Sequence, residues 1–225
     1  MQPYLFPYIG YFQLLCAVDE FVLYDDVNHI VRGWVNRNNY LVNNDKKLIS
    51  LSVKGASSNK LIRDLEFVND FHKYISTLET AYAKAPYKEQ VMKLIKNILS
   101  GDNMHITSVV ERSIEGIIQY LDIDGPRISS SSEIKGHNEL RGQKKILNIC
   151  AKLDADVYIN PSGGKDLYNQ STFEEKGIKL KFIEPGITEY KQLTSEFVPG
   201  LSIVDVMMFN SPSNVKEMLN NYELV

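Results

Sequence analysis

The chain has little cysteine, a single tryptophan, no long apolar run and no excess of either charge. Its two cysteines, Cys16 and Cys150, lie in apolar segments without a Cys-x-x-Cys partner. They are typical of small buried side chains in a reducing compartment, so we expect a cytoplasmic protein. No stretch approaches the roughly 18 consecutive apolar residues of a membrane span. The first residues also lack the basic and apolar regions of a signal peptide.

The charge is balanced, with 28 acidic and 25 basic side chains among 225 residues. That balance does not fit a protein that holds nucleic acid by releasing counterions. A hydrophobic content of 44% excludes intrinsic disorder and leaves room for a sizeable core. The residue present in excess is tyrosine, of which there are 13, including Tyr4, Tyr8, Tyr11 and Tyr24 near the start.

Strand-like and helix-like patterns alternate at both ends of the chain, and the middle is helical throughout. We expect strands at residues 2–5, 21–24, 127–129, 155–160 and 180–183, with a hairpin at 41–53. We expect helices at residues 8–18, 71–84, 87–99, 106–121, 139–153, 170–176, 201–209 and 214–222. The pattern predicts an α/β fold: an open, mostly parallel Rossmann-like sheet with an inserted helical segment at about 70–121, in one domain over residues 1–225.

Ligands of open parallel sheets bind outside the carboxyl ends of the strands. This rule places five segments on one rim: residues 3–11, 25–29, 54–59, 129–135 and 160–166. Within them, Asp25 and Asp26 follow an apolar strand directly, where a carboxylate can orient a ribose, a metal-bound water or an amine. The alternative is a helix cap or a turn residue.

Three further groups of polar residues suggest anion binding. Arg32, Asn36 and Arg37 offer planar donors for phosphate, and Trp34 can cover a base or sugar; the alternative is a solvated loop. The run that contains Ser130 and Ser131 can cradle a phosphate beside Lys135, unless it is an ordinary linker. The loop at residues 161–166 adds Lys165 but lacks the Walker A spacing.

The histidines show no zinc-ligand spacing, so we expect no metal site. His29 and His137 lie on the predicted rim and can do acid–base work, although a lone histidine is more often structural. His72 and His105 lie in expected helices, at surface or capping positions.

Five segments are similar to one known family: residues 1–14, with Met1-Gln2-Pro3-Tyr4 and Tyr8-Ile9-Gly10-Tyr11, and residues 17–27, 32–38, 155–159 and 201–210. They resemble the WbqC-like family, whose members are associated with bacterial O-antigen and capsule gene clusters. The resemblance covers nearly the whole chain. It implies a substrate that is an activated sugar, often an amino sugar carried on a nucleotide, but it does not supply a reaction.

A second resemblance concerns residues 6–11 and 128–131. They are similar to the His-x-Gly-His signature and the Ile-Ser-Ser-Thr stretch of the adenylyltransferase and pantothenate-synthetase superfamily. That likeness implies ATP as a cosubstrate. Both signature histidines are replaced here, by Tyr8 and Tyr11. Because tyrosine is neutral at pH 7, it stabilises a departing pyrophosphate less than a cationic histidine does.

Three hypotheses follow. The first is a transferase that acylates or aminoacylates the amine of a nucleotide-linked amino sugar. Asp25, Asp26 or His29 would accept the proton, and Tyr8, Tyr11, Arg32, Trp34, Asn36, Arg37, Ser130, Ser131, Lys135 and Lys165 would bind substrate. The second is an ATP-dependent nucleotidyltransferase or amide ligase. The third is a non-catalytic protein that binds sugar nucleotides or assembles with partners. Self-association of the chain stays open under all three.

Overall fold

A computed structural model describes residues 1–137 and 139–225. Two short strands that lie far apart in the sequence, β1 (Glu20–Leu23) and β4 (Arg127–Ser130), form a parallel pair in register Glu20 to Arg127. Phe21 and Leu23 of β1 point into the core, while Glu20 and Val22 remain partly exposed. This alternation follows from the two-residue period of a strand with one buried face. The parallel pairing brings the carboxyl ends of both strands to the same edge.

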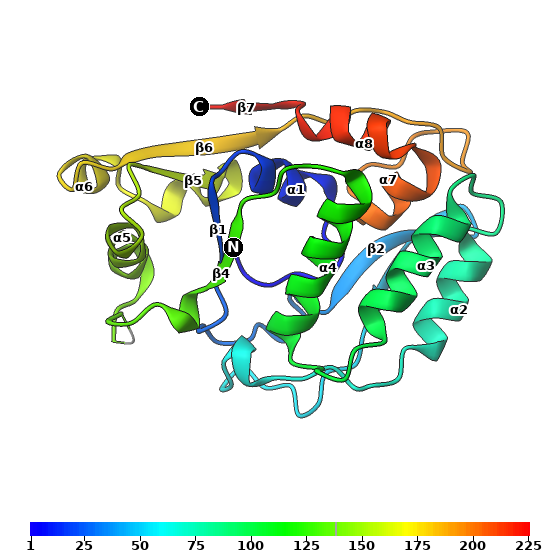
Figure 1. Ribbon diagram of the computed structural model, residues 1–225, viewed down its shortest axis with the longest axis horizontal. Coiled ribbons are helices and arrows are strands. Elements are labelled where there is room, and N and C mark those ends of the chain that lie inside the picture. Colours follow the sequence, from blue (N-terminus) through cyan, green and yellow to red (C-terminus); the bar gives the residue numbers. More distant parts are fainter. Residues whose placement is uncertain (138) are drawn as a thin grey trace.

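A second sheet contains β5 (Val157–Pro161), β6 (Lys179–Pro185) and β7 (Tyr222–Leu224), in that order. β5 and β6 are parallel, and β7 joins β6 antiparallel. The helices α5 (Gly142–Lys152) and α6 (Gln170–Glu174) lie at the same end of the molecule as this sheet (Figure 1). Phe173, Ile178 and Cys150 form a small separate core there.

The predicted hairpin is confirmed as β2 (Arg37–Val42) and β3 (Asp45–Ser50). Its two-residue turn consists of Asn43 and Asn44, with φ angles of 53° and 63°. Asparagine tolerates this left-handed conformation, and a turn of this kind matches the natural twist of paired strands. The strands begin and end a few residues earlier than the sequence pattern indicates.

The helices predicted for the middle of the chain are present. They are α2 (His72–Ala81), α3 (Lys88–Leu99) and α4 (Ile106–Leu121), and they lie side by side on the right of Figure 1. α4 buries residues spaced three and four apart, including Val110, Ile114 and Ile117, as its period predicts. The short turn η1 (Ile62–Asp64) packs near the start of α4.

The remaining helices close the main core. α1 (Ile9–Cys16) is buried along most of its length and contacts α8 (Pro212–Leu219), which follows α7 (Ile203–Phe209). Ser202 and Ser211 cap α7 and α8 with their hydroxyl groups. The final helix ends at Leu219, and β7 occupies part of the region predicted to be helical. None of the helices in the described part of the chain is long and apolar enough to cross a membrane.

The α/β class is confirmed, but a large open Rossmann-like sheet is not shown. Within residues 1–137 and 139–225, the strands divide into sheets of two, two and three, and the parallel pairs are β1–β4 and β5–β6. The strand predicted at residues 2–5 is absent, although Met1 hydrogen-bonds with Val22 and Tyr24 beside β1. Pro3 and Pro7 have no backbone N–H to donate, so they interrupt a ladder in this segment.

Candidate functional site

A buried polar cluster lies where β1 and β4 end. Oδ1 of Asp26 is 2.7 Å from Nζ of Lys145, and Oδ2 is 2.8 Å from Nε2 of His137. The hydroxyl of Ser131 donates to Oδ1 of Asp26 at 2.5 Å. Asp26 follows β1, Ser131 begins the turn η2 (Ser131–Glu133) after β4, and Lys145 comes from α5. We call these four residues the Asp26 cluster.

The Asp26 cluster is closed to solvent. The side chains of His137, Lys145 and Asp26 are 0%, 2% and 5% exposed. Burial by itself raises the pKa of Asp26, but hydrogen bonds from Lys145, Ser131 and His137 outweigh it, so the pKa lies below its usual value. Asp26 is therefore an ionised carboxylate at neutral pH, and Lys145 supplies the balancing charge.

His137 is the member of the cluster with an unused polar atom. Its Nε2 faces the Asp26 carboxylate, which can only accept a hydrogen bond, so Nε2 carries a proton. Its Nδ1 is buried and has no hydrogen-bond partner in the described part of the chain. A neutral imidazole in this arrangement presents the lone pair of Nδ1 as a base, held in place by Asp26.

Asp25 occupies a different environment from its neighbour. Its carboxylate accepts hydrogen bonds from the backbone N–H and hydroxyl of Ser132 and from the Thr107 hydroxyl, at 2.9 to 3.2 Å, and its backbone N–H donates to the Ser131 hydroxyl. Both carboxylate oxygens therefore accept hydrogen bonds, and the residue is 2% exposed. Through Ser132 and Thr107, Asp25 connects the turn η2 to α4, so its role is structural.

Lys145 is a site residue that the sequence did not predict, and of the two rim histidines it is His137, not His29, that contacts Asp26. In addition to Asp26 Oδ1, Nζ of Lys145 lies 3.1 Å from the Asp26 carbonyl oxygen and 4.8 Å from the Tyr24 ring centroid. A signal was available, because Lys145 lies four residues before the buried Ile149 on the apolar face of α5. A lysine on such a face needs a buried partner.

The tyrosines of the opening motif belong to the scaffold to different extents. Tyr11 is 1% exposed, and the centroid of its ring lies 5.2 Å from that of Phe21. Its hydroxyl donates to the Gln2 carbonyl. Tyr8 is partly buried and forms an isolated bridge with Ser202. The predicted ligand contact of Tyr11 is not supported by this placement, because no part of the side chain reaches the surface.

His29, the third predicted proton acceptor, lies outside the Asp26 cluster. It is 3% exposed, and its backbone N–H donates to the Lys60 carbonyl. Burial lowers the pKa of its imidazole, and Nδ1 has no partner in the described residues. The imidazole is therefore neutral and has no carboxylate to orient it in the described part of the chain.

The segment predicted to bind phosphate forms the turn that leads into β2: Arg32 and Trp34 are exposed, whereas Asn36 and Arg37 are half-buried, and Arg37 is the first residue of β2. Nε of Arg37 donates to the Gly33 carbonyl, and its guanidinium lies 5.6 Å from the Trp34 ring centroid. Asn36 donates to the Leu51 carbonyl. These contacts hold the loop in shape and do not reach the Asp26 cluster, so a role in substrate binding stays a prediction.

The other predicted anion-binding residues are dispersed. Ser130 is 9% exposed at the end of β4, directly before the cluster's Ser131. Lys135 is exposed two residues before His137, in the segment that leads to α5. Lys165 instead pairs with Glu184 at 2.8 Å, beside β6. The rim segments at 25–29 and 129–135 therefore meet as predicted, whereas Lys165 faces a different neighbour.

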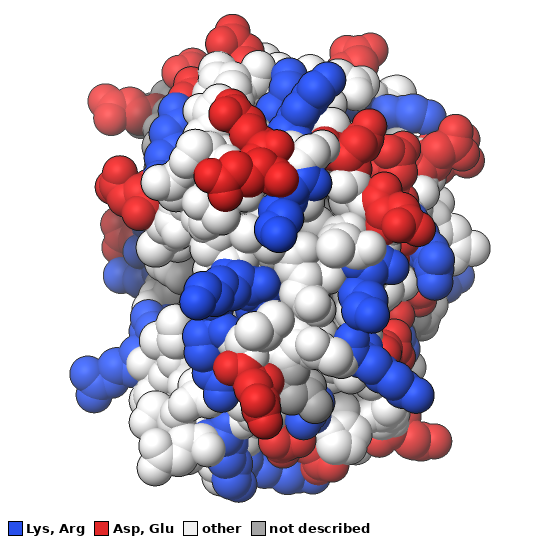
Figure 2. Space-filling model, turned by 90° about the vertical axis from the view of Figure 1, so that its left-hand side faces the viewer, with Lys and Arg blue, Asp and Glu red and all other residues white. Residues whose placement is uncertain are grey.

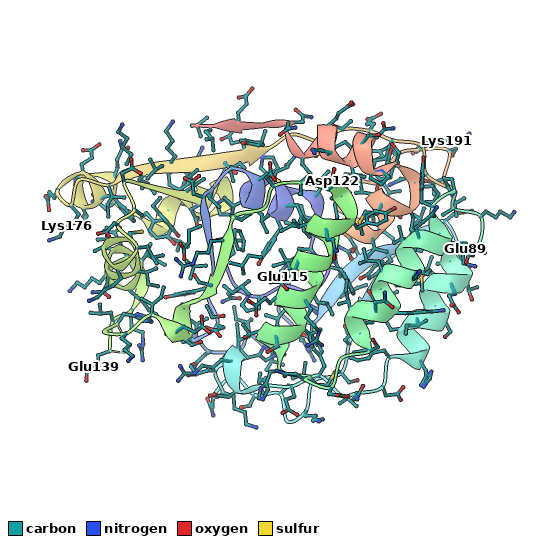
Figure 3. The ribbon with its side chains drawn as sticks, in the orientation of Figure 1. Glu89, Glu115, Asp122, Glu139, Lys176 and Lys191 are labelled. Carbon is teal, nitrogen blue, oxygen red and sulfur yellow. The ribbon has the colours of Figure 1, made fainter. Side chains whose placement is uncertain are left out.

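The face around α5 is charged. Glu139, near the start of α5, and Lys176, after α6, lie on the outer margin of the molecule (Figure 3). Several Lys and Arg side chains cross the middle of this side (Figure 2). Among the described residues, no group of three or more His, Cys, Asp or Glu side chains is placed to hold a metal ion.

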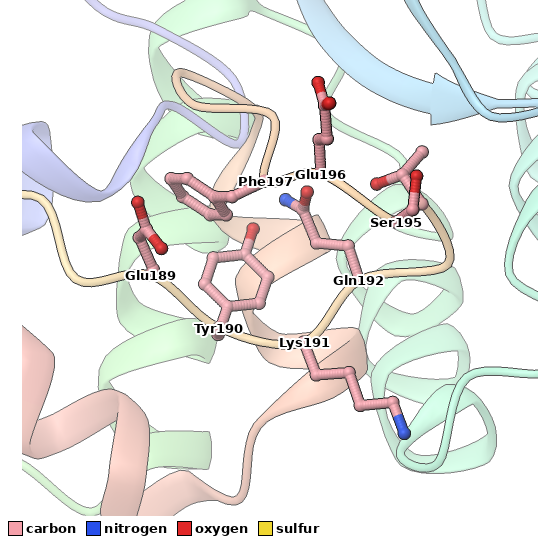
Figure 4. A pocket seen from close by; sticks show the side chains of 8 residues that line it. Glu189, Tyr190, Lys191, Gln192, Ser195, Glu196 and Phe197 are labelled. Atoms are coloured by element: carbon pink, nitrogen blue, oxygen red, sulfur yellow. The ribbon is translucent and has the colours of Figure 1, made fainter.

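A shallow cavity of about 310 Å³ lies elsewhere, in the loop between β6 and α7 (Figure 4). It is lined by Glu189, Tyr190, Gln192, Glu196 and Phe197, among others. The hydroxyl of Tyr190 donates to the buried Asp205 at 2.6 Å, and Gln192 donates to the same carboxylate. These bonds attach the loop to α7.

Comparison with known proteins identifies the family. The profile of the WbqC-like protein family matches residues 2–217, so the chain belongs to this family. It is also 28% identical over 220 residues to the uncharacterized protein Rv1507c of Mycobacterium tuberculosis, covering 95% of this chain and 93% of that protein. No solved structure matches significantly.

Proposed function

We propose that this member of the WbqC-like family transfers an acyl or aminoacyl group to the amine of a nucleotide-linked amino sugar. The observation that carries the proposal is the hydrogen bond from His137 Nε2 to Asp26 Oδ2, with Nδ1 left without a partner in the described residues. An amine must lose its proton to form an amide, and an oriented neutral imidazole is suited to take it.

The reaction can be written with His137 as the general base. The amine nitrogen attacks the carbonyl carbon of an activated acyl donor, and its proton passes to Nδ1 of His137. The new C–N bond forms as the bond from the carbonyl carbon to the leaving group breaks. The leaving group then takes the proton from Nδ1, which returns the imidazole to its neutral state. Asp26 keeps the ring oriented and stabilises the transient imidazolium.

Lys145 keeps the local charge low. Its ammonium offsets the Asp26 carboxylate at 2.7 Å, so the buried cluster does not accumulate negative charge. The exposed Lys135, near His137 in the sequence, is suited to attract the diphosphate of a sugar nucleotide. Because the His137 side chain is enclosed, the proposal requires the chain around it to open on the Nδ1 side when substrate binds.

The test is a direct assay of transfer. The purified protein is incubated with UDP-linked and dTDP-linked amino sugars and with acyl thioesters or aminoacyl esters, and acyl addition is detected by mass spectrometry. We expect a mass gain with at least one pair. His137→Asn should abolish it while nucleotide-sugar binding by calorimetry is retained.

The matched control is His72→Asn, which changes an exposed histidine on α2 whose backbone, and not its ring, makes the contact with Asp70. It should leave transfer unchanged. Thermal melting of both variants separates loss of activity from loss of the fold. The proposal fails if no donor and sugar pair gives a mass gain, or if a folded His137→Asn protein transfers at the wild-type rate.

A further inference from the structure

One part of the chain carries a strong positive charge that the overall composition hides. Residues 27–63 contain seven Lys or Arg and one Asp, a net charge of +6 in a chain whose net charge is −3. The segment includes the loop before β2, the β2–β3 hairpin and the connection to η1. The rest of the chain is correspondingly acidic.

Three of these cations form ion pairs and others do not. Lys47 pairs with Asp45, Lys54 with Glu66 and Arg63 with Asp64, at 2.9 to 3.7 Å. In the described part of the chain, Arg32, Arg37 and Lys60 have no acidic partner within ion-pair distance. Their charge is therefore available to a ligand outside the protein.

The same region exposes large apolar side chains. Ile30, Val31 and Trp34 are 57%, 50% and 50% exposed, on one short loop. The backbone turns sharply here, since the Gly33 N–H donates to the Ile30 carbonyl at 2.7 Å and Arg32 has a φ of 66°. We call residues 30–34 the apolar loop. About half of the surface of each of these three side chains is in contact with water, although one side of the Trp34 ring packs against Tyr4, with ring centroids 6.1 Å apart.

Among the described residues, three of the four cations without an acidic partner belong to segments near the apolar loop; the fourth, Lys46, donates to the Pro199 carbonyl. Arg32 is at its tip, and Arg37 is held against it by the hydrogen bond to Gly33 and the contact with Trp34. The backbone of Lys60 is adjacent, because its carbonyl accepts a hydrogen bond from the N–H of His29, the residue before Ile30, while its ammonium lies beside Gly55. No acidic residue occurs between residues 27 and 44.

We propose that the apolar loop docks the protein on an anionic lipid surface. Tryptophan and aliphatic side chains are favoured at the boundary between headgroups and acyl chains, and nearby Lys and Arg are attracted to anionic headgroups. The two contributions act together, as reversible membrane binding requires. A nucleotide needs a concave site that covers most of its surface, which half-exposed Ile30, Val31 and Trp34 do not provide.

The proposal does not depend on the transferase activity, and the chain contains its own probe. Trp34 is the single tryptophan, so intrinsic emission reports directly on the apolar loop. The full chain is titrated with vesicles of phosphatidylcholine, with and without phosphatidylglycerol. With the anionic vesicles we expect the emission to shift to shorter wavelength and the protein to sediment with the lipid. High salt should weaken both effects.

Two variants separate the contributions. Arg32→Glu/Lys60→Glu should reduce affinity for anionic vesicles at least about 25-fold, since each cation near such a surface contributes about fivefold. Ile30→Ser/Val31→Ser should lower the affinity for anionic vesicles more than the matched control Leu167→Ser does. Leu167 is 70% exposed and lies outside the apolar loop. All of these positions are exposed, and thermal melting checks the fold of each variant.

Three results would contradict membrane docking, and two of them would assign the apolar loop to another ligand. Absence of both sedimentation and an emission shift with anionic vesicles contradicts it. A shift produced by UDP alone that also prevents vesicle binding assigns the loop to nucleotide recognition instead. A stable dimer that dissociates on Trp34→Ser, without vesicle binding, assigns the loop to self-association.

Discussion

Nζ of Lys145 lies 2.7 Å from Oδ1 of Asp26, and the two side chains are 2% and 5% exposed. The pair connects α5, at one end of the molecule, to the segment that follows β1. Two charges removed from water in this way are stable only as partners, because neither alone recovers the hydration it has lost. The Asp26 cluster therefore has a structural consequence that can be measured independently of any reaction.

The pair predicts strong coupling between two substitutions. Asp26→Asn leaves the Lys145 ammonium buried without its counter-charge and should lower the free energy of unfolding by about 3–5 kcal/mol. Lys145→Met should cost a similar amount. The double variant should lose clearly less than the sum of the two single changes, as measured by urea denaturation. Additive losses would mean that the two charges do not stabilise one another.

The hydrogen bonds of Gln13 indicate that the opening motif has a structural role. Its amide nitrogen donates to the carbonyls of Gly186, Met218 and Asn221 at 2.8 to 3.1 Å, which ties α1 to the C-terminal segments. Gln13→Leu preserves much of the volume but removes the side-chain donor from all three carbonyls, of which those of Met218 and Asn221 still accept from a backbone N–H, so we expect a loss of about 1–3 kcal/mol in stability. The exposed Gln90→Leu should change it by less than about 0.5 kcal/mol. Equal effects of both would contradict this role.

Tyr11→Phe distinguishes a core residue from a phosphate contact. The substitution removes only the hydroxyl that donates to the Gln2 carbonyl at 3.2 Å. We expect a stability loss of about 1 kcal/mol and no change in transfer activity or nucleotide affinity. Nucleotide binding by calorimetry and urea denaturation test the two parts. A large loss of nucleotide affinity in a stable variant would favour the adenylyltransferase-like hypothesis.

His29 predicts a pH dependence of stability. Burial lowers the pKa of its imidazole below the usual 6.5, so the folded state favours the neutral ring. The stability that the neutral His29 ring contributes is fully present above pH 6.5, the pKa of the unfolded chain, and is lost as the pH falls through the lower pKa of the folded state. Between about pH 7.5 and about pH 5, the wild type should therefore lose stability relative to His29→Gln.

Asp26 does not interfere with that measurement. Its folded-state pKa lies below the usual 3.8, so its contribution is lost only at more acidic pH. Unfolding by urea at several pH values, compared between the wild type and His29→Gln, provides the test. A stability difference that is constant over this range would show that His29 is not buried in neutral form.

Much of the secondary structure could be predicted from local sequence. The apolar spacing of α4 and the Asn43–Asn44 turn depend on near neighbours in the chain, so their patterns are complete within a few residues. The parallel relation of β1 and β4 was also predictable, and with it the meeting of Asp26 and Ser131. Pro3 and Pro7 are evident in the sequence, yet the strand expected at residues 2–5 does not form.

The partners of Asp26 were decided by tertiary structure. His137 and Lys145 are more than a hundred residues away along the chain, at 111 and 119 positions, and no local pattern connects them to Asp26. They meet because α5 packs with its lysine facing the end of β1. Tyr11 also lies in the core, where its ring packs against Phe21, although its motif suggested a ligand contact.

The sequence by itself determined the family, the α/β class and the positions of most elements, because these depend on local periodicity and on motifs that are contiguous in the chain. It also contained the basic segment at 27–63, whose charge is a matter of counting. Only the tertiary structure decided which polar residues share a buried site and which apolar ones remain in water. Burial and pairing depend on contacts between distant segments, and these exist only once the chain has packed.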